Sequence, residues 1–393
     1  LDSDIHNYLE DISFESDYEA PITLRHLMTH TAGFEAREEG VFVDKANQML
    51  TLKEYLQKYK PEQVYPPGEV PAYSNYGTAL AGYIVEKVSG KPYDTYIQEN
   101  IFDVLAMNDT TMKQPLPEDM ADDMATGYGA GGKEIDFEII QATPAGATSS
   151  TGIDMATFML AHINQGQFWE RILKPGTTSL MHQHQFGVIE NWPGWTHGFM
   201  EQEINNRRVI WHGGDTFAFH SSLVIDPKAN LGIYLSYNGA GGERARVKFL
   251  QAFYDRYFPG KGEDYQKVSA SSPEDILGTY YASRRAYSSA EKLLAFTNYL
   301  QIDEGEQGQI VTTRGGLFNR KMTEWVQVGP SLYKEKNKKG MMLIQNKNGE
   351  RYVYFKNNPT YGYINQEWYS NPKLHLWLIG VTLLLSILML LFG

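Results

Sequence analysis

The residues best suited to chemistry are Tyr73 and Asn75, two positions apart in the stretch Tyr65–Gly77. A phenol can take or give a proton, and a side-chain amide can hydrogen-bond a carbonyl group. The prolines of this stretch fix φ, and Gly68 can adopt a left-handed turn conformation. We therefore expect a stiff loop that presents the tyrosine and the amide just before a helix.

That helix is predicted from Tyr76 to Val88, because apolar residues recur near helical spacing and Ser89-Gly90 can end it. A proline-rich turn with a surface tyrosine is the alternative interpretation. Tyr73-Ser74-Asn75 resembles the Tyr-x-Asn motif of the serine β-lactamase and penicillin-binding-protein superfamily, in its class C-like branch. That branch includes β-lactamases, DD-peptidases, D-amino-acid peptidases and esterases, and the flanking Tyr-Pro-Pro-Gly favours the resemblance.

A second stretch, Pro21–Phe34, resembles a segment that supports the floor of the active site in the same family. Thr23 can cap a short helix there, and Gly33 can end it. The match extends over about a dozen residues, so it is more specific than a tripeptide.

The same stretch contains two histidines at helical spacing, His26 and His30, which could in principle share a helix face and bind zinc. The glutamate of a His-Glu-x-x-His site is absent, because Leu27 occupies its position. We therefore predict no metal site.

The third stretch is Ile210–Pro227, in which two apolar runs flank glycines, and Leu231–Tyr237 is a further β-rich run. These runs predict antiparallel strands. His212-Gly213-Gly214 resembles the family's third motif, a strand with Lys or His followed by x-Gly, although a tight turn with a solvated histidine is the alternative. His182 and His184 lack such a context and are interpreted as surface or loop residues.

The resemblance implies a role for each matched residue. Tyr73 would be the general acid/base, with its phenol shifted toward phenolate by a nearby cation. Asn75 would orient the substrate amide, and His212 would be the electrostatic partner at the third motif. A histidine in place of the lysine of true β-lactamases favours peptidase or esterase chemistry. The remaining site residues are two glycines that shape the strand and a candidate backbone oxyanion donor: Gly213, Gly214 and Asp215.

The family mechanism also needs a Ser-x-x-Lys pair, which forms an acyl-enzyme and precedes the Pro21–Phe34 segment. The literal matches all follow His212, in the wrong order for the family: Ser289/Lys292, Ser331/Lys334 and Ser370/Lys373. Two explanations stay open. The chain is a piece of an active hydrolase whose nucleophile would precede Leu1, or it is a degenerate homologue that binds without turnover.

The composition of the chain excludes some classes of binding partner. The net charge of −12 argues against nucleic acid, because phosphate binding needs a basic face. The sequence has no cysteine, which excludes disulfides and thiolate metal sites. The resemblance implies no metal or organic cofactor, and it implies peptide, ester or β-lactam substrates.

The chain is predicted to have an α+β fold of the β-lactamase/DD-peptidase type over residues 1–258, with an antiparallel sheet flanked by helices. A linker over 259–270 and a small β-barrel or sandwich over 271–367 would follow, since short β-prone runs recur there and Asn348-Gly349 signals a hairpin.

Residues 374–392 carry no formal charge and are long enough, at roughly 29 Å, to span a membrane. We expect membrane lipid as a partner and a cell-membrane protein of the bacterial envelope, with its catalytic domain outside the cytoplasm. The expected function is acyl-enzyme hydrolysis of peptides, amides or esters. The alternative is an inactive β-lactamase-like binding protein.

Overall fold

The computed structural model describes residues 1–260, 274–306, 309–315, 320–336 and 338–392. The chain forms two compact units. The first consists of Leu1–Glu263 together with Asn357–Thr360, and the second of Asp264–Lys356 together with Tyr361–Gly393.

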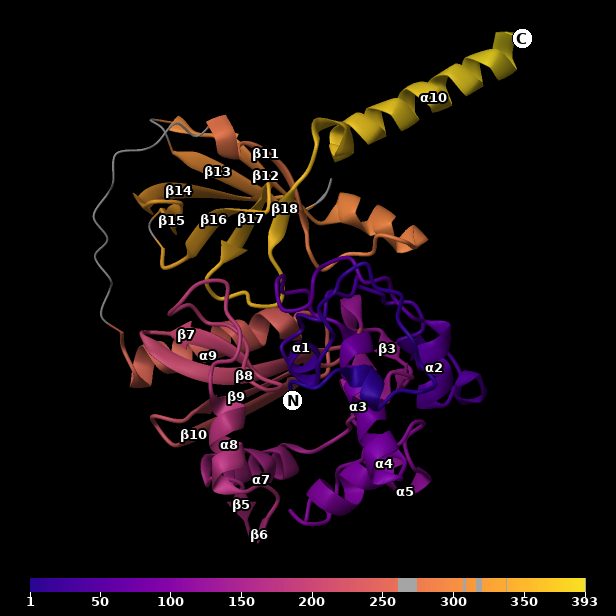
Figure 1. Cartoon of the computed structure of the whole chain (residues 1–393), viewed down its shortest axis with the longest axis vertical. Coiled ribbons are helices and arrows are strands. Elements are labelled where there is room, and N and C mark those ends of the chain that lie inside the picture. Colours follow the sequence, from indigo (N-terminus) through magenta and orange to yellow (C-terminus); the bar gives the residue numbers. More distant parts are fainter. Residues whose placement is uncertain (261–273, 307–308, 316–319, 337, 393) are drawn as a thin grey trace. The chain divides into compact units, whose positions relative to one another are not determined.

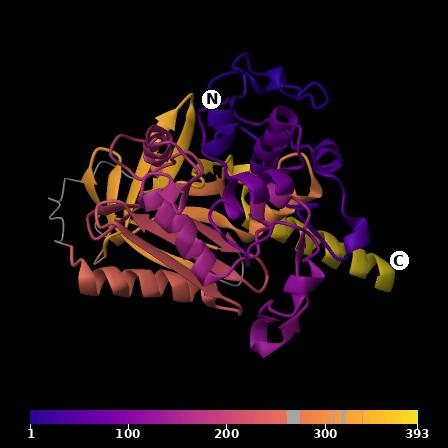
Figure 2. The same cartoon turned by 90° about the horizontal axis from the view of Figure 1, so that it is seen from below.

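The first unit contains an antiparallel sheet in the strand order β10-β9-β8-β7, as the third stretch predicts (Figure 1). Helix α9 (Gly242–Tyr257) runs along one face of this sheet (Figure 2), and α7 (Gly152–Ile163) packs against the other face. The four strands are β7 (Met200–Ile204), β8 (Arg207–Asp215), β9 (His220–Asp226) and β10 (Leu231–Tyr237).

Successive side chains of β8 point to opposite faces of the sheet, as the pleat of a strand requires. Val209 belongs to the cluster that contains Leu250 of α9, whereas Ile210 belongs to the cluster that contains Met159 of α7. The side chain of His212 therefore lies on the α7 face, two residues along from Ile210.

Helix α3 (Asn75–Ser89) begins one residue earlier than predicted and ends where predicted. Ser74 caps it by accepting a hydrogen bond from the Gly77 N–H, and Gly90 ends it in the left-handed conformation at φ 71°. Its buried residues include Leu80, which packs in the core of the helical region with α1 and α2.

Helix α1 (Leu24–Met28) starts at the predicted Thr23 cap but ends earlier than expected. The expectation that Gly33 ends it was wrong. Gly33 instead adopts φ 86° where the Tyr65 carbonyl comes so close that a Cβ would lie 2.0 Å from the oxygen. A close backbone approach therefore requires this glycine.

Helix α2 (Leu52–Lys58) begins with a capping box formed by Thr51 and Glu54. Helix α4 is followed directly by a π-helical segment. The other elements of this unit are η1 (Ile5–Asn7), β1 (Phe42–Val43), η2 (Ala46–Gln48), α4 (Tyr93–Ile97), η3 (Gln98–Phe102), α5 (Glu118–Ala121), β2 (Gly127–Tyr128), η4 (Ala130–Gly132), β3 (Glu134–Ile135), β4 (Ile139–Ile140), α6 (Thr143–Gly146), β5 (Gln167–Phe168), β6 (Glu170–Arg171) and α8 (Pro175–His182).

The described residues of the second unit close an eight-stranded antiparallel barrel, β11 to β18. Asn348 and Gly349 both have positive φ between β16 and β17, which is the hairpin that the sequence predicts. Inward side chains such as Leu300, Met342 and Val353 form its core. The elements are η5 (Glu274–Ile276), β11 (Gly278–Ala282), η6 (Ala290–Thr297), β12 (Tyr299–Glu304), β13 (Ile310–Arg314), β14 (Lys321–Gly329), β15 (Leu332–Glu335), β16 (Met341–Lys347), β17 (Glu350–Phe355), β18 (Tyr363–Asn365) and η8 (Trp368–Ser370).

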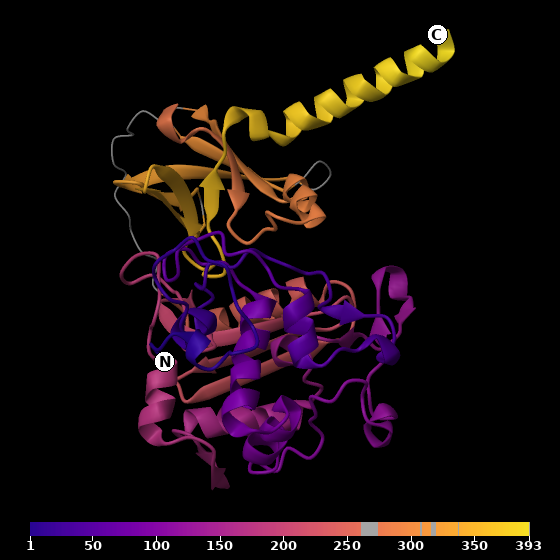
Figure 3. The same cartoon turned by 45° about the vertical axis from the view of Figure 1, so that its right-hand side comes forward.

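The last element is α10 (Pro372–Phe392), one continuous exposed helix with a mean hydropathy of 2.4 (Figure 3). Its length and composition suffice for a membrane crossing. The predicted linker over 259–270 lies outside the described residues beyond residue 260.

Candidate functional site

The loop that carries Tyr73 is held by the second sequence stretch. Gly68 adopts the predicted left-handed conformation at φ 81°, and its N–H donates to the Thr31 carbonyl at 2.7 Å. The Ala72 N–H donates to the His30 carbonyl at 2.9 Å. These bonds fix the backbone on which the tyrosine stands.

His30 lies directly against Tyr73. Their ring centroids are 4.1 Å apart in a stacked arrangement, and the Nδ1 atom of His30 accepts a hydrogen bond from the Ser74 N–H. His30 adopts φ 52° beyond the end of α1, so it does not share a helix face with His26. Among the described residues, no group of three or more His, Cys, Asp or Glu side chains could hold a metal ion, and the absence of a metal stays a prediction.

Sequence analysis treated His30 only as a metal candidate and missed its contact with Tyr73. The signal was present, because the resemblance already assigned this stretch to the floor of the site. Trp195 was missed without any such signal. It is fully buried, its ring lies 4.4 Å from His30, and its Nε1–H donates to the Pro359 carbonyl of the same unit.

His212 faces Tyr73 from the sheet, with ring centroids 6.2 Å apart. Its Nδ1 atom lies 2.8 Å from the Gly213 carbonyl oxygen, which can only accept, so Nδ1 carries the proton. Burial lowers the pKa of His212, and the Arg246 guanidinium lowers it further. The ring is therefore neutral near pH 7, and its Nε2 lone pair is available to accept a proton or hydrogen bond.

Asn75 is the first residue of α3 and directly follows the loop that carries Tyr73. Its Nδ2 atom donates to the Glu38 carboxylate at 3.3 Å. Glu38 thus orients the amide, and the orientation of a substrate amide by Asn75 stays a prediction.

The segment His212–Asp215 of β8 extends beyond strand β7, whose last pair with β8 joins Met200 to Trp211. Strand β9 pairs with the other edge of this segment. At Gly214 a Cβ would lie 2.8 Å from the Ser221 Oγ atom, so cross-strand packing favours glycine there.

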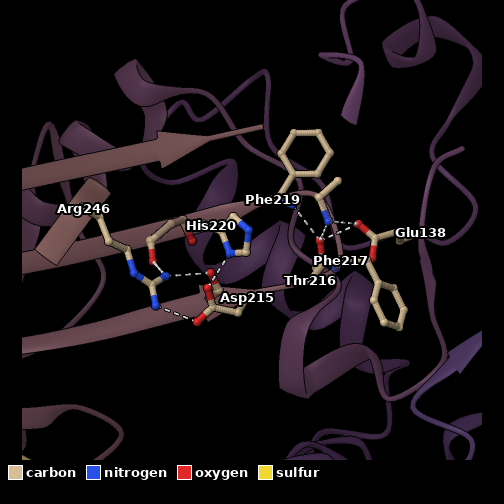
Figure 4. A network of polar contacts seen from close by, with 10 residues as sticks. Glu138, Asp215, Thr216, Phe217, Phe219, His220 and Arg246 are labelled. Carbon is tan, nitrogen blue, oxygen red and sulfur yellow. Dashed lines mark hydrogen bonds and ion pairs between the residues drawn. The ribbon is translucent and has the colours of Figure 1, made fainter. Parts of the chain in front are cut away.

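Asp215 ends β8 in a charged network (Figure 4). Its carboxylate accepts hydrogen bonds from Arg246 Nη2 at 2.6 Å and from His220 Nδ1 at 2.7 Å. Arg246 is 6% exposed and also donates to the Gly214 and Ser221 carbonyls. The network fixes the strand end, and the role of the Asp215 N–H as an oxyanion donor stays a prediction.

The interpretation as surface or loop residues is confirmed for His184, which is exposed and lies outside the helices and strands, and was wrong for His182. His182 is the last residue of α8, and its Nε2 atom lies 3.1 Å from Nδ1 of the buried His162. His184 forms an ion pair with Glu201, a carboxylate that is 2% exposed. His182 thus packs against buried side chains, whereas His184 stays at the surface.

The literal Ser-x-x-Lys matches all belong to the second unit. Ser289 caps η6, Ser331 lies in the β14–β15 turn at φ 60°, and the Ser370 carbonyl accepts from the Tyr281 hydroxyl. Each serine has a local structural role. In the first unit, the described geometry brings together a phenol, a neutral imidazole and an exposed strand edge, which suits proton transfer and the binding of an extended amide.

Several known proteins are similar to this chain in sequence and in fold. The sequence pattern of the Beta-lactamase family matches residues 1–254. The chain is 29% identical to the D-alanyl-D-alanine-carboxypeptidase/endopeptidase AmpH of Escherichia coli, over 55% of this chain and 58% of the relative. It is 24% identical to penicillin-binding protein 4 of Amycolatopsis lactamdurans, over 56% of this chain and 60% of the relative. Alignments with the curated relatives span 35% to 60% of their lengths.

Solved structures show the same fold. The octameric penicillin-binding protein homologue from Pyrococcus abyssi matches with a TM-score of 0.53 and 18% identity, over 93% of this chain and 82% of that chain. The β-lactamase/D-alanine carboxypeptidase from Pseudomonas syringae matches with a TM-score of 0.52 and 21% identity, over 65% of this chain and 77% of that chain. The predicted fold class is confirmed as a β-lactamase-like α+β domain, followed by the barrel and the long apolar helix. The chain belongs to the Beta-lactamase family.

Proposed function

We propose that the intact protein is a serine hydrolase that acts through an acyl-enzyme on peptide, amide or ester substrates, of the D-amino-acid peptidase, esterase or penicillin-binding type. The observation that carries the proposal is the approach of the Tyr73 ring to His212 at 6.2 Å, next to the β8 segment that extends beyond β7. The serine and lysine would be supplied by a segment that precedes Leu1.

Tyr73 acts as the general acid/base in this proposal. The stacked His30 ring and the capped helix start restrict the tyrosine, so its hydroxyl is positioned before substrate arrives. His212 contributes a neutral acceptor rather than a positive charge, because burial lowers its pKa. Peptidase or esterase substrates therefore suit the site better than the carboxylate of a β-lactam.

The substrate lies as an extended chain along the edge of His212–Asp215, where the backbone of β8 supplies hydrogen bonds. Asn75 holds a substrate amide, and the Asp215 N–H is the candidate oxyanion donor. The glycines at 213 and 214 keep this edge unobstructed by side chains.

The apolar helix α10 is proposed as a membrane anchor that holds the first unit outside the cytoplasm. Three aromatic residues at or near its start, Trp368, Tyr369 and Trp377, are 57% to 76% exposed and suit the membrane interface. Removal of residues 372–393 should release the protein from membranes into the soluble fraction. Retention of the truncated protein in the membrane fraction would contradict the anchor.

A second candidate is an inactive peptide-binding protein of the cell envelope. It is favoured by the local structural roles of Ser289, Ser331 and Ser370. The two candidates are separated by labelling the folded full-length protein with a fluorophosphonate and a fluorescent penicillin, and by mapping the labelled peptide with mass spectrometry. A labelled serine upstream of Leu1 supports the hydrolase, and no label with either probe supports the binding protein.

A further inference from the structure

A large aromatic side chain is exposed on the turn that follows β8. Phe217 is 72% exposed, although burial of a phenyl ring is normally favourable. Its ring centroid lies 5.4 Å from that of the half-buried Phe42, in a tilted arrangement. The two rings form a phenyl pair with an open face.

Glu138 holds the turn that carries Phe217 (Figure 4). Its carboxylate accepts hydrogen bonds from the Thr216 hydroxyl, from the Phe217 N–H at 2.7 Å and from the Ala218 N–H at 3.1 Å. The Thr216 Oγ1 atom in turn accepts from the Phe219 N–H at 3.0 Å. A carboxylate bound to several donors gives the turn one fixed conformation, so the exposed ring is held in place.

The same short segment also positions the second ring. Ile140, two residues after Glu138, pairs with Phe42 in the β1–β4 ladder. One stretch of three residues thus fixes both members of the phenyl pair. Two aromatic rings that are held in place lose little conformational entropy when they bind a third apolar group.

Both ends of the phenyl pair connect to the candidate site. Along β8, the exposed edge runs from His212 to Asp215, a length of roughly 10 Å at the usual strand rise. On the other side, Glu38 accepts from Asn75 Nδ2 and lies four residues before Phe42. An extended substrate on this edge would reach the pair about three residues from His212.

We propose that Phe42 and Phe217 form a specificity-determining subsite for an aromatic group of the substrate, and that Glu138 is its positioning residue. The inference deepens the proposed function, on which it rests for the binding of an extended amide along β8. The substrate class is a peptide or acylated peptide with a phenyl-like group about three residues from the position next to His212.

The test measures dissociation constants of the folded full-length protein by isothermal titration calorimetry, so it does not depend on turnover. One probe pair is phenylacetyl-triglycine amide and acetyl-triglycine amide. The other is acetyl-triglycine phenethylamide and acetyl-triglycine ethylamide, which covers the reverse chain direction. Glycine avoids any choice of side-chain chirality.

In one of the two directions, the aromatic probe should bind about threefold to tenfold more tightly than its aliphatic match, as expected for an aromatic contact. Phe217→Ala should bring this ratio close to one, and Phe217→Trp should restore it. Glu138→Gln should reduce the ratio without changing the affinity for the aliphatic probe. Phe249→Ala, the same change at a 44% exposed phenylalanine of α9, is the matched control.

Equal affinities within both probe pairs would overturn the subsite, as would a preference that survives both Phe217→Ala and Phe42→Ala. Failure of the two proposals can be distinguished. A labelled serine without aromatic preference rejects only the subsite, whereas aromatic preference without any labelled serine rejects only the hydrolase.

Discussion

The two faces of strand β8 hold different kinds of side chain. On the α9 face, Arg246 and Asp215 form a charged network that closes on the backbone carbonyls of β8 and β9. On the opposite face, His212 faces the ring of Tyr73, which in turn stacks against His30. The charged face fixes the strand, and the aromatic face presents neutral groups that can exchange protons. In the proposed function, positioning and chemistry therefore lie on opposite sides of one strand.

The largest effect on stability should come from Arg246, because it is buried and binds three acceptors. Arg246→Met leaves two carbonyls and one carboxylate without this donor, which should lower the free energy of unfolding by about 2 kcal/mol. Urea denaturation measures this change. The control is Arg244→Met, an exposed position of the same helix, which should change stability little. Equal losses of stability in the two variants would contradict the role of Arg246 in fixing strand β8.

A smaller effect should appear in the pH dependence of stability, which the histidine pair His162 and His182 near α7 should cause. Burial lowers the pKa of His162 to about 4 and that of His182 to about 4. The unfolded chain, with pKa values near 6.5, then binds more protons than the folded chain between these values. The stability contributed by the neutral pair is complete above about pH 6.5 and is lost as the pH falls toward 4.

The free energy of unfolding should therefore drop by at least about 1 kcal/mol between pH 7 and pH 5. His182→Gln should make this drop smaller. Denaturant titrations at the two pH values measure it. An unchanged drop in His182→Gln would reject the neutral buried pair.

The smallest effect concerns the cap that positions Tyr73 and Asn75. Ser74→Ala removes the acceptor for the Gly77 N–H and should cost about 1 kcal/mol. Ser89→Ala, at the other end of α3, serves as the comparison. Thermal unfolding midpoints of the two variants should differ by about 2 °C, and identical midpoints would show that the cap does not stabilise the loop.

Local patterns predicted those parts of the fold that depend on neighbours in sequence. The Thr23 cap, the Gly90 stop and the Asn348-Gly349 hairpin follow from turn and capping chemistry. Gly33 was misinterpreted, because the carbonyl that excludes a side chain there comes from Tyr65, more than thirty residues away. Long-range approaches of this kind leave no periodic signal.

In the candidate site, too, the residues that depend on long-range contacts could not be predicted. Resemblance to the family pointed to Tyr73, Asn75 and His212, and the structure brings the first and third together. Trp195 could not be predicted, since its role depends on tertiary contacts with His30 and Pro359. The phenyl pair depends likewise on a carboxylate from a distant segment.

The central claim of the proposed function is that the Tyr73 hydroxyl carries out the proton transfer, while its ring packs against His30. The most direct measurement is the rate of covalent labelling of the folded full-length protein by a fluorophosphonate, for wild type and Tyr73→Phe, with Tyr257→Phe on the exposed surface of α9 as control. We predict that Tyr73→Phe labels at least about a hundredfold more slowly, while its unfolding midpoint is unchanged. Labelling of Tyr73→Phe at the wild-type rate would contradict the account.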